Sequence, residues 1–190
     1  MLRILFTGGG TGGHIYPILA VAEELKAMEK SAGMELDLRY LGAPGSHKNL
    51  LKANGINVSR IFSVKLRRYF DLRNFLDIII FPISLLQAFW KIFWLMPDVL
   101  FSKGGPGALP VVLMCKFYRV PIIIHESDAV PGLTNKLSER FSDRVGISFS
   151  SAATFFKNKN IALVGNPVRR SLLEQGIEKA SAKKNFGFNP

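Results

Sequence analysis

The chain has 190 residues, of which 48% are hydrophobic and 21% charged, so it can bury a sizeable core and is not globally disordered. Its formal net charge of +11 favours an anionic partner: nucleic acid, an anionic membrane surface or a phosphorylated substrate. The single cysteine, Cys115, excludes an internal disulfide and a cysteine-based metal cluster, and suits a reducing cytoplasm. Glycines rather than a cleavage site follow the short apolar start of the chain, so we expect no signal peptide.

Strand and helix patterns alternate along the chain. An apolar run over 2–7 predicts a strand, and the helix predicted over 15–30 carries Ile15, Ile18, Leu19, Ala22 and Leu25 on one face. The later predicted strands are 36–42, 56–62, 97–105, which runs into a second glycine turn, 120–127, 143–148 and 161–167, which ends in a Gly-Asn-Pro turn. The later predicted helices are 46–54, 108–118 and 131–141. This order predicts an α/β fold, a Rossmann-like doubly wound parallel sheet with ligand-binding loops at the carboxyl ends of its strands.

The first of these loops is unusually rich in glycine. Gly8, Gly9, Gly10, Gly12 and Gly13 follow the first strand, and the spacing Gly8-x-Gly10-x-x-Gly13 matches the dinucleotide fingerprint. The second strand, however, ends in Leu41-Gly42-Ala43-Pro44 without the carboxylate that holds a ribose hydroxyl, which counts against a dinucleotide. No Gly-Lys-Ser/Thr follows either, so a nucleoside triphosphate loop is not indicated. A loop whose backbone N–H groups and helix dipole bind another phosphate is favoured over a simple turn.

His14 stands where this loop meets the helix. It could be a general base beside a substrate hydroxyl, or it could cap the helix or simply pack against it. The residues alone leave both interpretations open.

Two further polar loops follow later strands. In "SKGGPG", Lys103, Gly104 and Gly105 could bind a second phosphate, and "HESD" places His125, Glu126, Ser127 and Asp128 on the same edge of the sheet. The alternative is ordinary turn chemistry, because Ser, Asp, Pro and Gly all favour turns.

Residues 65–96 form a basic and then strongly apolar segment. Asp77, Ser84, Gln87 and Lys91 fall in one narrow sector of the predicted helix, and the rest of its circumference is apolar. A buried core helix and a bilayer-spanning helix compete with a helix that packs partly on the core and partly in lipid headgroups. We favour the last, with membrane contact through Arg67, Arg68, Phe75, Ile79, Phe89, Trp90 and Trp94. Nucleic acid is not expected, because the aromatic residues lie in a helical block and not on a stacking platform.

In combination, "GGGTGGHIYP", "FSKGGPGALPVVL", "IIIHESDAVPGLTNKL" and "VGNPVR" resemble the amino-terminal half of the MurG-type glycosyltransferases, family 28, which have the GT-B fold. The resemblance covers essentially the whole chain. It implies an inverting, metal-independent transfer, without a cofactor, of GlcNAc from UDP-GlcNAc to a lipid-diphosphate-linked MurNAc-pentapeptide. It also implies a peripheral position on the cytoplasmic face of an anionic membrane, as an enzyme of peptidoglycan synthesis.

The same resemblance implies roles for individual residues. His14 matches the candidate catalytic base. The residues expected to contact the UDP-GlcNAc donor are Thr11, Gly12, Gly13, Asp128 and Arg169, and those expected to bind the acceptor diphosphate are Gly10, Lys103, Gly104, Gly105, His125 and Glu126.

The sequence also departs from the family pattern. "HESD" replaces the commoner "HEQN", so the donor contact at Asp128 has a carboxylate in place of an amide, and "KGGPG" lacks the usual aromatic residue. We expect residues 1–165 to form the acceptor-binding, membrane-associated domain, and 166–190, with the polar tail 178–190, to lead into a donor-binding domain that is absent here. The chain alone is expected to be inactive. The alternative is a non-catalytic, lipid-diphosphate-binding and membrane-anchoring subunit of a two-chain transferase, whose donor domain is a separate chain.

Overall fold

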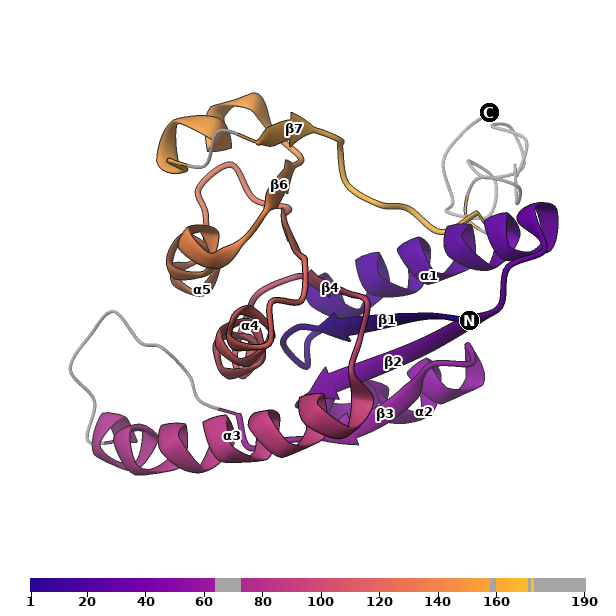
Figure 1. Ribbon diagram of the computed structural model, residues 1–190. Coiled ribbons are helices and arrows are strands. Elements are labelled where there is room, and N and C mark those ends of the chain that lie inside the picture. Colours follow the sequence, from indigo (N-terminus) through magenta and orange to yellow (C-terminus); the bar gives the residue numbers. More distant parts are fainter. Residues whose placement is uncertain (64–72, 158–159, 171, 173–190) are drawn as a thin grey trace, which may run out of the picture.

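A computed structural model describes residues 1–63, 73–157, 160–170 and 172, with only the backbone for residues 73–76. Strands and helices alternate along the chain (Figure 1). The strands are β1 (Leu2–Thr7), β2 (Leu36–Gly42), β3 (Asn57–Arg60), β4 (Val99–Ser102), β5 (Ile122–Glu126), β6 (Arg144–Ile147) and β7 (Ile161–Leu163). The α-helices are α1 (Gly12–Ala32), α2 (Lys48–Ala53), α3 (Arg73–Leu95), α4 (Ala108–Phe117) and α5 (Leu133–Ser138), and the short 3-10 helices are η1 (Gly45–His47), η2 (Glu139–Phe141) and η3 (Ser150–Phe155).

The strands form one sheet in the order β3-β2-β1-β4-β5-β6-β7, and every pair is parallel. The predicted Rossmann-like, doubly wound architecture is therefore confirmed. The chain builds outward from β1 in one direction and from β4 in the other, so the order reverses between these two strands. In sheets of this kind, the crevice beyond the carboxyl ends of the strands at that reversal is where ligands bind.

Alternating residues of β1 assign the helices to the two faces of the sheet. Ile4 and Phe6 belong to a buried cluster with α1 and α2, whereas Leu5 lies in a second cluster with residues of α3 and α4. Because neighbouring strand residues point to opposite faces, α1 and α2 cover one face and α3 and α4 the other. The predicted face of α1 is confirmed: Ile15, Ile18, Leu19 and Ala22 are buried in the first cluster, and Leu25 packs against it.

The first helix begins earlier than its sequence pattern predicted. It starts at Gly12, so Gly12, Gly13 and His14 form its first turn and are not part of the loop. Thr11 is the extended residue before the helix, and its carbonyl accepts hydrogen bonds from the backbone N–H groups of His14 and Ile15. Apolar periodicity begins only at Ile15 because the first turn faces the loops and not the core. The helix start therefore has no hydrophobic signal.

Candidate functional site

The glycine loops after β1 and β4 meet at the point where the strand order reverses. The backbone N–H of Gly9 donates to the carbonyl of Gly104 over 2.9 Å, and the N–H of Lys103 donates to the carbonyl of Thr7. The polar residues after β5 lie on the same edge of the sheet, next to β4. The structure thus brings together the three loops that the sequence separated by more than a hundred residues.

The imidazole of His14 lies between two of these glycines. A Cβ atom added to Gly9 would lie 2.9 Å from His14 Nδ1, and one added to Gly105 would lie 2.6 Å from His14 Nε2. Any side chain at either position would collide with the ring. His14 Nδ1 lies 2.8 Å from the hydroxyl oxygen of Thr11, so the ring is fixed by packing and by one hydrogen bond.

The surroundings of His14 favour its neutral form. Partial burial lowers its pKa, and the nearby positive charge of Lys103 lowers it further, while the carboxylates of Glu126 and Asp128 act in the opposite direction. A neutral imidazole can accept a proton. If Nδ1–H donates to the Thr11 hydroxyl, the free electron pair is on Nε2, the atom next to Gly105.

Lys103 is a buried cation that links β4 to β5 and to the segment after β7. Its ammonium donates to His125 Nδ1 over 3.0 Å and to the hydroxyl of Ser127. His125 Nε2 in turn donates to the carbonyl of Gly165 over 2.9 Å, and Ser127 Oγ donates to Asn166 Oδ1 over 2.8 Å. The Lys103 ammonium is therefore linked, through the side chains of His125 and Ser127, to the two consecutive residues Gly165 and Asn166 that follow β7.

This network fixes the protonation of its members. Because His125 Nδ1 accepts from Lys103 and Nε2 donates to a carbonyl, His125 is neutral. Burial, and secondly the Lys103 charge, lower the pKa of His125 to about 4. Burial lowers the pKa of Lys103 to about 8, against the opposing effect of Glu126 and Asp128. Lys103 and His125 were predicted to bind the acceptor diphosphate, and the structure gives both of them partners within the protein.

Glu126 holds the turn after β5. Its two carboxylate oxygens accept hydrogen bonds from the backbone N–H groups of Asp128 and Gly132 and from Asn135 Nδ2, over 3.0 to 3.1 Å. This buried carboxylate, predicted as a phosphate contact, would repel a phosphate and is already satisfied by three donors. Asp128 is exposed at the rim of the same turn.

The remaining glycines of the predicted site differ in what they do. Gly104 and Gly105 have φ values of +74° and +84°, which favour glycine, and a Cβ on Gly104 would overlap the Asn135 side chain. A Cβ on Gly10 would lie 2.6 Å from the carbonyl oxygen of Ala43, so Gly10 allows the first loop to pack on the loop after β2. Gly12 and Gly13 place backbone N–H groups at the amino end of α1, where anions bind favourably.

Beyond β7 the chain crosses to α1 (Figure 1). The guanidinium of Arg169 lies over the ring of Tyr16, 5.1 Å from its centroid. Arg170 forms two hydrogen bonds to the carboxylate of Glu24, of 2.6 and 3.1 Å. Arg169 is therefore held beside the first turns of α1, and its contact with the UDP-GlcNAc donor stays a prediction. The predicted boundary at residue 165 stays a prediction, and the tail 178–190 lies outside the described residues.

Helix α3 presents its apolar side to solvent. Ser84, Ala88 and Ile92 are fully buried, whereas Ile79 and Trp94 are 64% and 78% exposed. Only 17% of the apolar stretch Asp77–Leu95 is buried, so the alternative of a fully buried core helix is wrong; the stretch is long and apolar enough to cross a membrane, by length and composition only. We define the exposed α3 face as Ile78, Ile79, Ile83, Leu86, Trp90, Phe93 and Trp94.

The polar side of α3 faces the protein. Ser84 Oγ donates to the carbonyl of Phe62, and Gln87 accepts from the Phe62 N–H. Of the predicted membrane residues, Phe89 is half-buried against rings of Phe117 and Tyr118. Arg67, Arg68 and the side chain of Phe75 lie outside the described residues.

Several residues of the site had no signal in the sequence. Asn135, Tyr16 and Asn166 contact Glu126, Arg169 and Ser127 respectively; each lies within a motif that carries the family resemblance, but none was singled out as a site residue. Only the "GNP" turn marked Asn166 as lying near the end of a strand.

Comparisons with known proteins assign the family. Residues 4–147 match the glycosyltransferase family 28 N-terminal domain. A relative from Bacillus cereus, named UDP-N-acetylglucosamine--N-acetylmuramyl-(pentapeptide) pyrophosphoryl-undecaprenol N-acetylglucosamine transferase 2, is 38% identical over 98% of this chain and 51% of its own length. A Clostridium botulinum transferase of the same name, without the number, is 40% identical over 97% of this chain and 52% of its own. The chain thus spans about half the length of these curated relatives.

Solved structures agree on the fold. MurG from Acinetobacter baumannii superposes with a TM-score of 0.69 at 24% identity, covering 89% of this chain and 46% of that protein. A UDP-GlcNAc 2-epimerase from Neisseria meningitidis, solved with UDP-GlcNAc, gives a TM-score of 0.62 at 11% identity, covering 97% of this chain and 53% of the epimerase.

Proposed function

Because the chain belongs to glycosyltransferase family 28, we propose that it forms the acceptor-binding half of an inverting transferase. The transferase moves GlcNAc from UDP-GlcNAc to an undecaprenyl-diphosphate-linked MurNAc-pentapeptide. The main support is His14, a neutral imidazole held between Gly9 and Gly105 at the reversal of the strand order. The relatives act in peptidoglycan synthesis, and their names supply the donor and the acceptor of the proposed reaction.

In the proposed reaction, His14 Nε2 takes the proton of the acceptor hydroxyl as that oxygen attacks the anomeric carbon of GlcNAc. The bond from that carbon to the UDP oxygen breaks, and UDP leaves with the electron pair. Thr11 accepts the Nδ1–H of His14 and so positions the ring. No step needs a metal or another cofactor.

The glycine backbone forms the proposed phosphate site. The left-handed backbone of Gly104 and Gly105 lies beside His14, and the N–H groups of Gly12 and Gly13, expected to face the donor, lie at the amino end of α1. We propose that the acceptor diphosphate binds at Gly104 and Gly105, with the Lys103 ammonium adding positive potential nearby. Asp128 and Arg169 are proposed to contact the donor from the rim.

The exposed α3 face is the proposed membrane contact, on the cytoplasmic side of the cell membrane. Seven large apolar side chains in solvent form a patch that soluble monomers seldom expose without a partner. A lipid-linked acceptor is itself held in the membrane, so docking by α3 would bring the crevice to its substrate.

A reconstituted assay tests this function. We would mix the chain with the separately produced carboxyl-terminal half of a relative, lipid-linked acceptor and labelled UDP-GlcNAc, and measure labelled lipid product. His14→Gln and His14→Ala are expected to lower turnover by about 10² to 10⁴ while leaving the circular dichroism spectrum unchanged. Lys30→Ala, at the exposed far end of α1, is the control.

Two results would contradict the proposal. A loss under threefold in both His14 variants would remove His14 as the base. Product formation with no partner half would contradict a chain that supplies only the acceptor site. Tight acceptor binding without product, with several partner halves, would favour the non-catalytic, lipid-diphosphate-binding subunit.

A further inference from the structure

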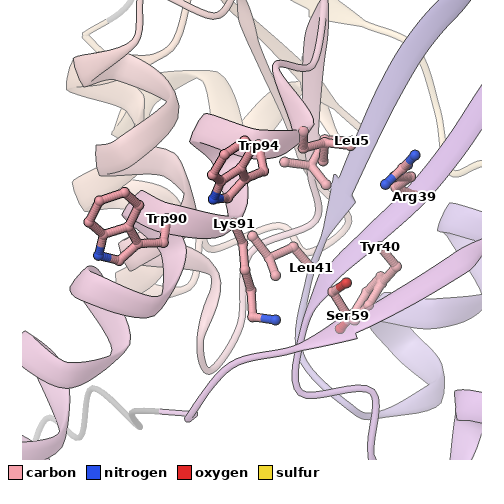
Figure 2. A pocket seen from close by; sticks show the side chains of 9 residues that line it. Leu5, Arg39, Tyr40, Leu41, Ser59, Trp90, Lys91 and Trp94 are labelled. Carbon is pink, nitrogen blue, oxygen red and sulfur yellow. The ribbon is translucent and has the colours of Figure 1, made fainter.

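A pocket lies between the last turns of α3 and strands β1, β2 and β3 (Figure 2). Its volume is about 280 Å³. It is lined by Leu5, Arg39, Tyr40, Leu41, Ser59, Trp90, Lys91, Trp94 and Leu95. None of these residues belongs to the proposed transfer site. A water molecule occupies about 30 Å³ in the liquid, so the pocket has room for several heavy atoms. Its volume therefore suits a small polar group such as a glycerol phosphate.

The polar groups of the pocket favour an anion. Lys91 comes from α3 and Arg39 from β2, and Figure 2 shows them on opposite sides of the pocket, with Ser59 on the sheet side. Arg39 uses its Nε to bind the carboxylate of Asp37 over 2.8 Å, and its side chain is 46% exposed. That ion pair leaves the two terminal nitrogens of Arg39 for another acceptor. Within the described part of the chain, Lys91 has no ion pair.

The apolar part of the pocket continues onto the exposed α3 face. Trp90 and Trp94 line the pocket and are also 52% and 78% exposed. A ligand here would meet two exposed cations at the pocket and a large apolar surface beside it. A soluble phosphate compound would leave the indoles in water, whereas a phospholipid satisfies both parts, and tryptophan is enriched at the headgroup level of membranes.

We propose that this pocket binds the phosphate headgroup of an anionic phospholipid, between Lys91 and Arg39, with the acyl chains passing over Trp90 and Trp94. The inference rests on the proposed docking of the exposed α3 face and adds a discrete headgroup site to it. It gives docking a preference for anionic lipid that does not depend on the overall charge of the chain. The ligand is a lipid of the surrounding membrane and not the acceptor, which binds at the glycine loops.

The two tryptophans of the pocket are the only ones in the sequence, so intrinsic fluorescence reports on the pocket and on the part of the exposed α3 face that adjoins it. We would titrate the chain with vesicles of phosphatidylcholine, or of phosphatidylcholine with phosphatidylglycerol, and follow the blue shift and its quenching by brominated acyl chains. Arg39→Gln/Lys91→Gln removes both cations of the pocket. Lys30→Gln/Lys52→Gln removes the same charge from exposed positions on α1 and α2, which cover the opposite face of the sheet.

We expect the pocket variant to lose at least tenfold in apparent affinity for phosphatidylglycerol vesicles, since each surface cation near anionic lipid is worth about fivefold. Its binding to neutral vesicles should be unchanged, and the control pair should lose less than threefold. Equal losses in the two pairs, or none in the pocket variant, would overturn the headgroup site. Saturation of the fluorescence change by inorganic phosphate without vesicles would overturn the lipid and indicate a soluble anion.

A separate variant distinguishes failure of the pocket from failure of docking. Ile79→Ser/Leu86→Ser alters the exposed α3 face away from the pocket and should weaken binding to both kinds of vesicle. If the unaltered chain binds neither kind, the proposed docking fails, and the headgroup site fails with it. If docking holds and only the pocket pair has no effect, the headgroup site alone is refuted.

Discussion

Substitution of Gly105 tests whether the His14 ring packs between the two glycine loops. In Gly105→Ala the new Cβ would lie 2.6 Å from His14 Nε2 and 2.9 Å from the backbone nitrogen of Gly9. The backbone there has φ +84°, which costs an L-residue about 1–2 kcal/mol. Forcing an extra methyl group into a packed site costs about 1–3 kcal/mol more. The substitution should therefore lower the free energy of unfolding by about 2–5 kcal/mol.

Gly33→Ala separates the two contributions. Gly33 also has a left-handed φ, +64°, but no atom lies within 4 Å of the position of its Cβ. Its substitution should cost only the backbone contribution, about 1–2 kcal/mol. Urea denaturation of the chain and both variants, followed by circular dichroism, measures the difference. If Gly105→Ala costs no more than Gly33→Ala, the His14 ring is not packed on Gly105, and the proposed position of the base is refuted.

Three other predictions concern the buried network and the His14 ring. The unfolded chain protonates His125 below pH 6.5 and the folded chain only near pH 4. The contribution of neutral His125 to the free energy of unfolding is therefore fully present above pH 6.5, and on the order of 3 kcal/mol is lost as the pH falls to 4. His125→Gln should flatten this part of the pH–stability curve, and an unchanged slope would contradict a neutral buried His125. Lys103→Met removes a positive charge that lowers the His14 pKa, so the His14 ring protons should titrate at higher pH by NMR, and a lower or equal value would contradict their coupling. Thr11→Val removes one hydrogen bond to His14 and should reduce turnover in the reconstituted assay by about two- to tenfold, with a changed ¹⁵N tautomer signature; full activity would show that Thr11 does not position the ring.

Local sequence determined most of the fold. The apolar strands separated by helices predicted the parallel sheet, because parallel neighbouring strands need a long crossover connection, which is usually a helix. The faces were also encoded: the 3.6-residue spacing from Ile15 to Ala22 identified the buried side of α1. The glycine loops and His14 could be identified because glycine at high density and histidine at a helix start are local signals.

The tertiary structure decided which polar groups are partners. Lys103, His125 and Glu126 looked alike in the sequence, as polar residues after strands, yet the fold satisfies all three within the protein. Their partners Gly165 and Asn135 lie within recognisable motifs, but nothing in those motifs marks them as hydrogen-bond partners. Hydrogen-bond partners of this kind are set by the register of β4, β5 and β6, which no local pattern specifies.

The same division applies to the apolar segment. Its sequence established a helix with one narrow polar sector, and a polar sector ordinarily faces water. Here Ser84 and Gln87 of that sector face the Phe62 backbone, whose hydrogen-bonding groups they satisfy, and the large apolar side is left outside. Hydrophobic periodicity fixes which residues share a face of a helix. Only the packing of the neighbouring elements, which must satisfy their own buried polar groups, decides which face turns inward.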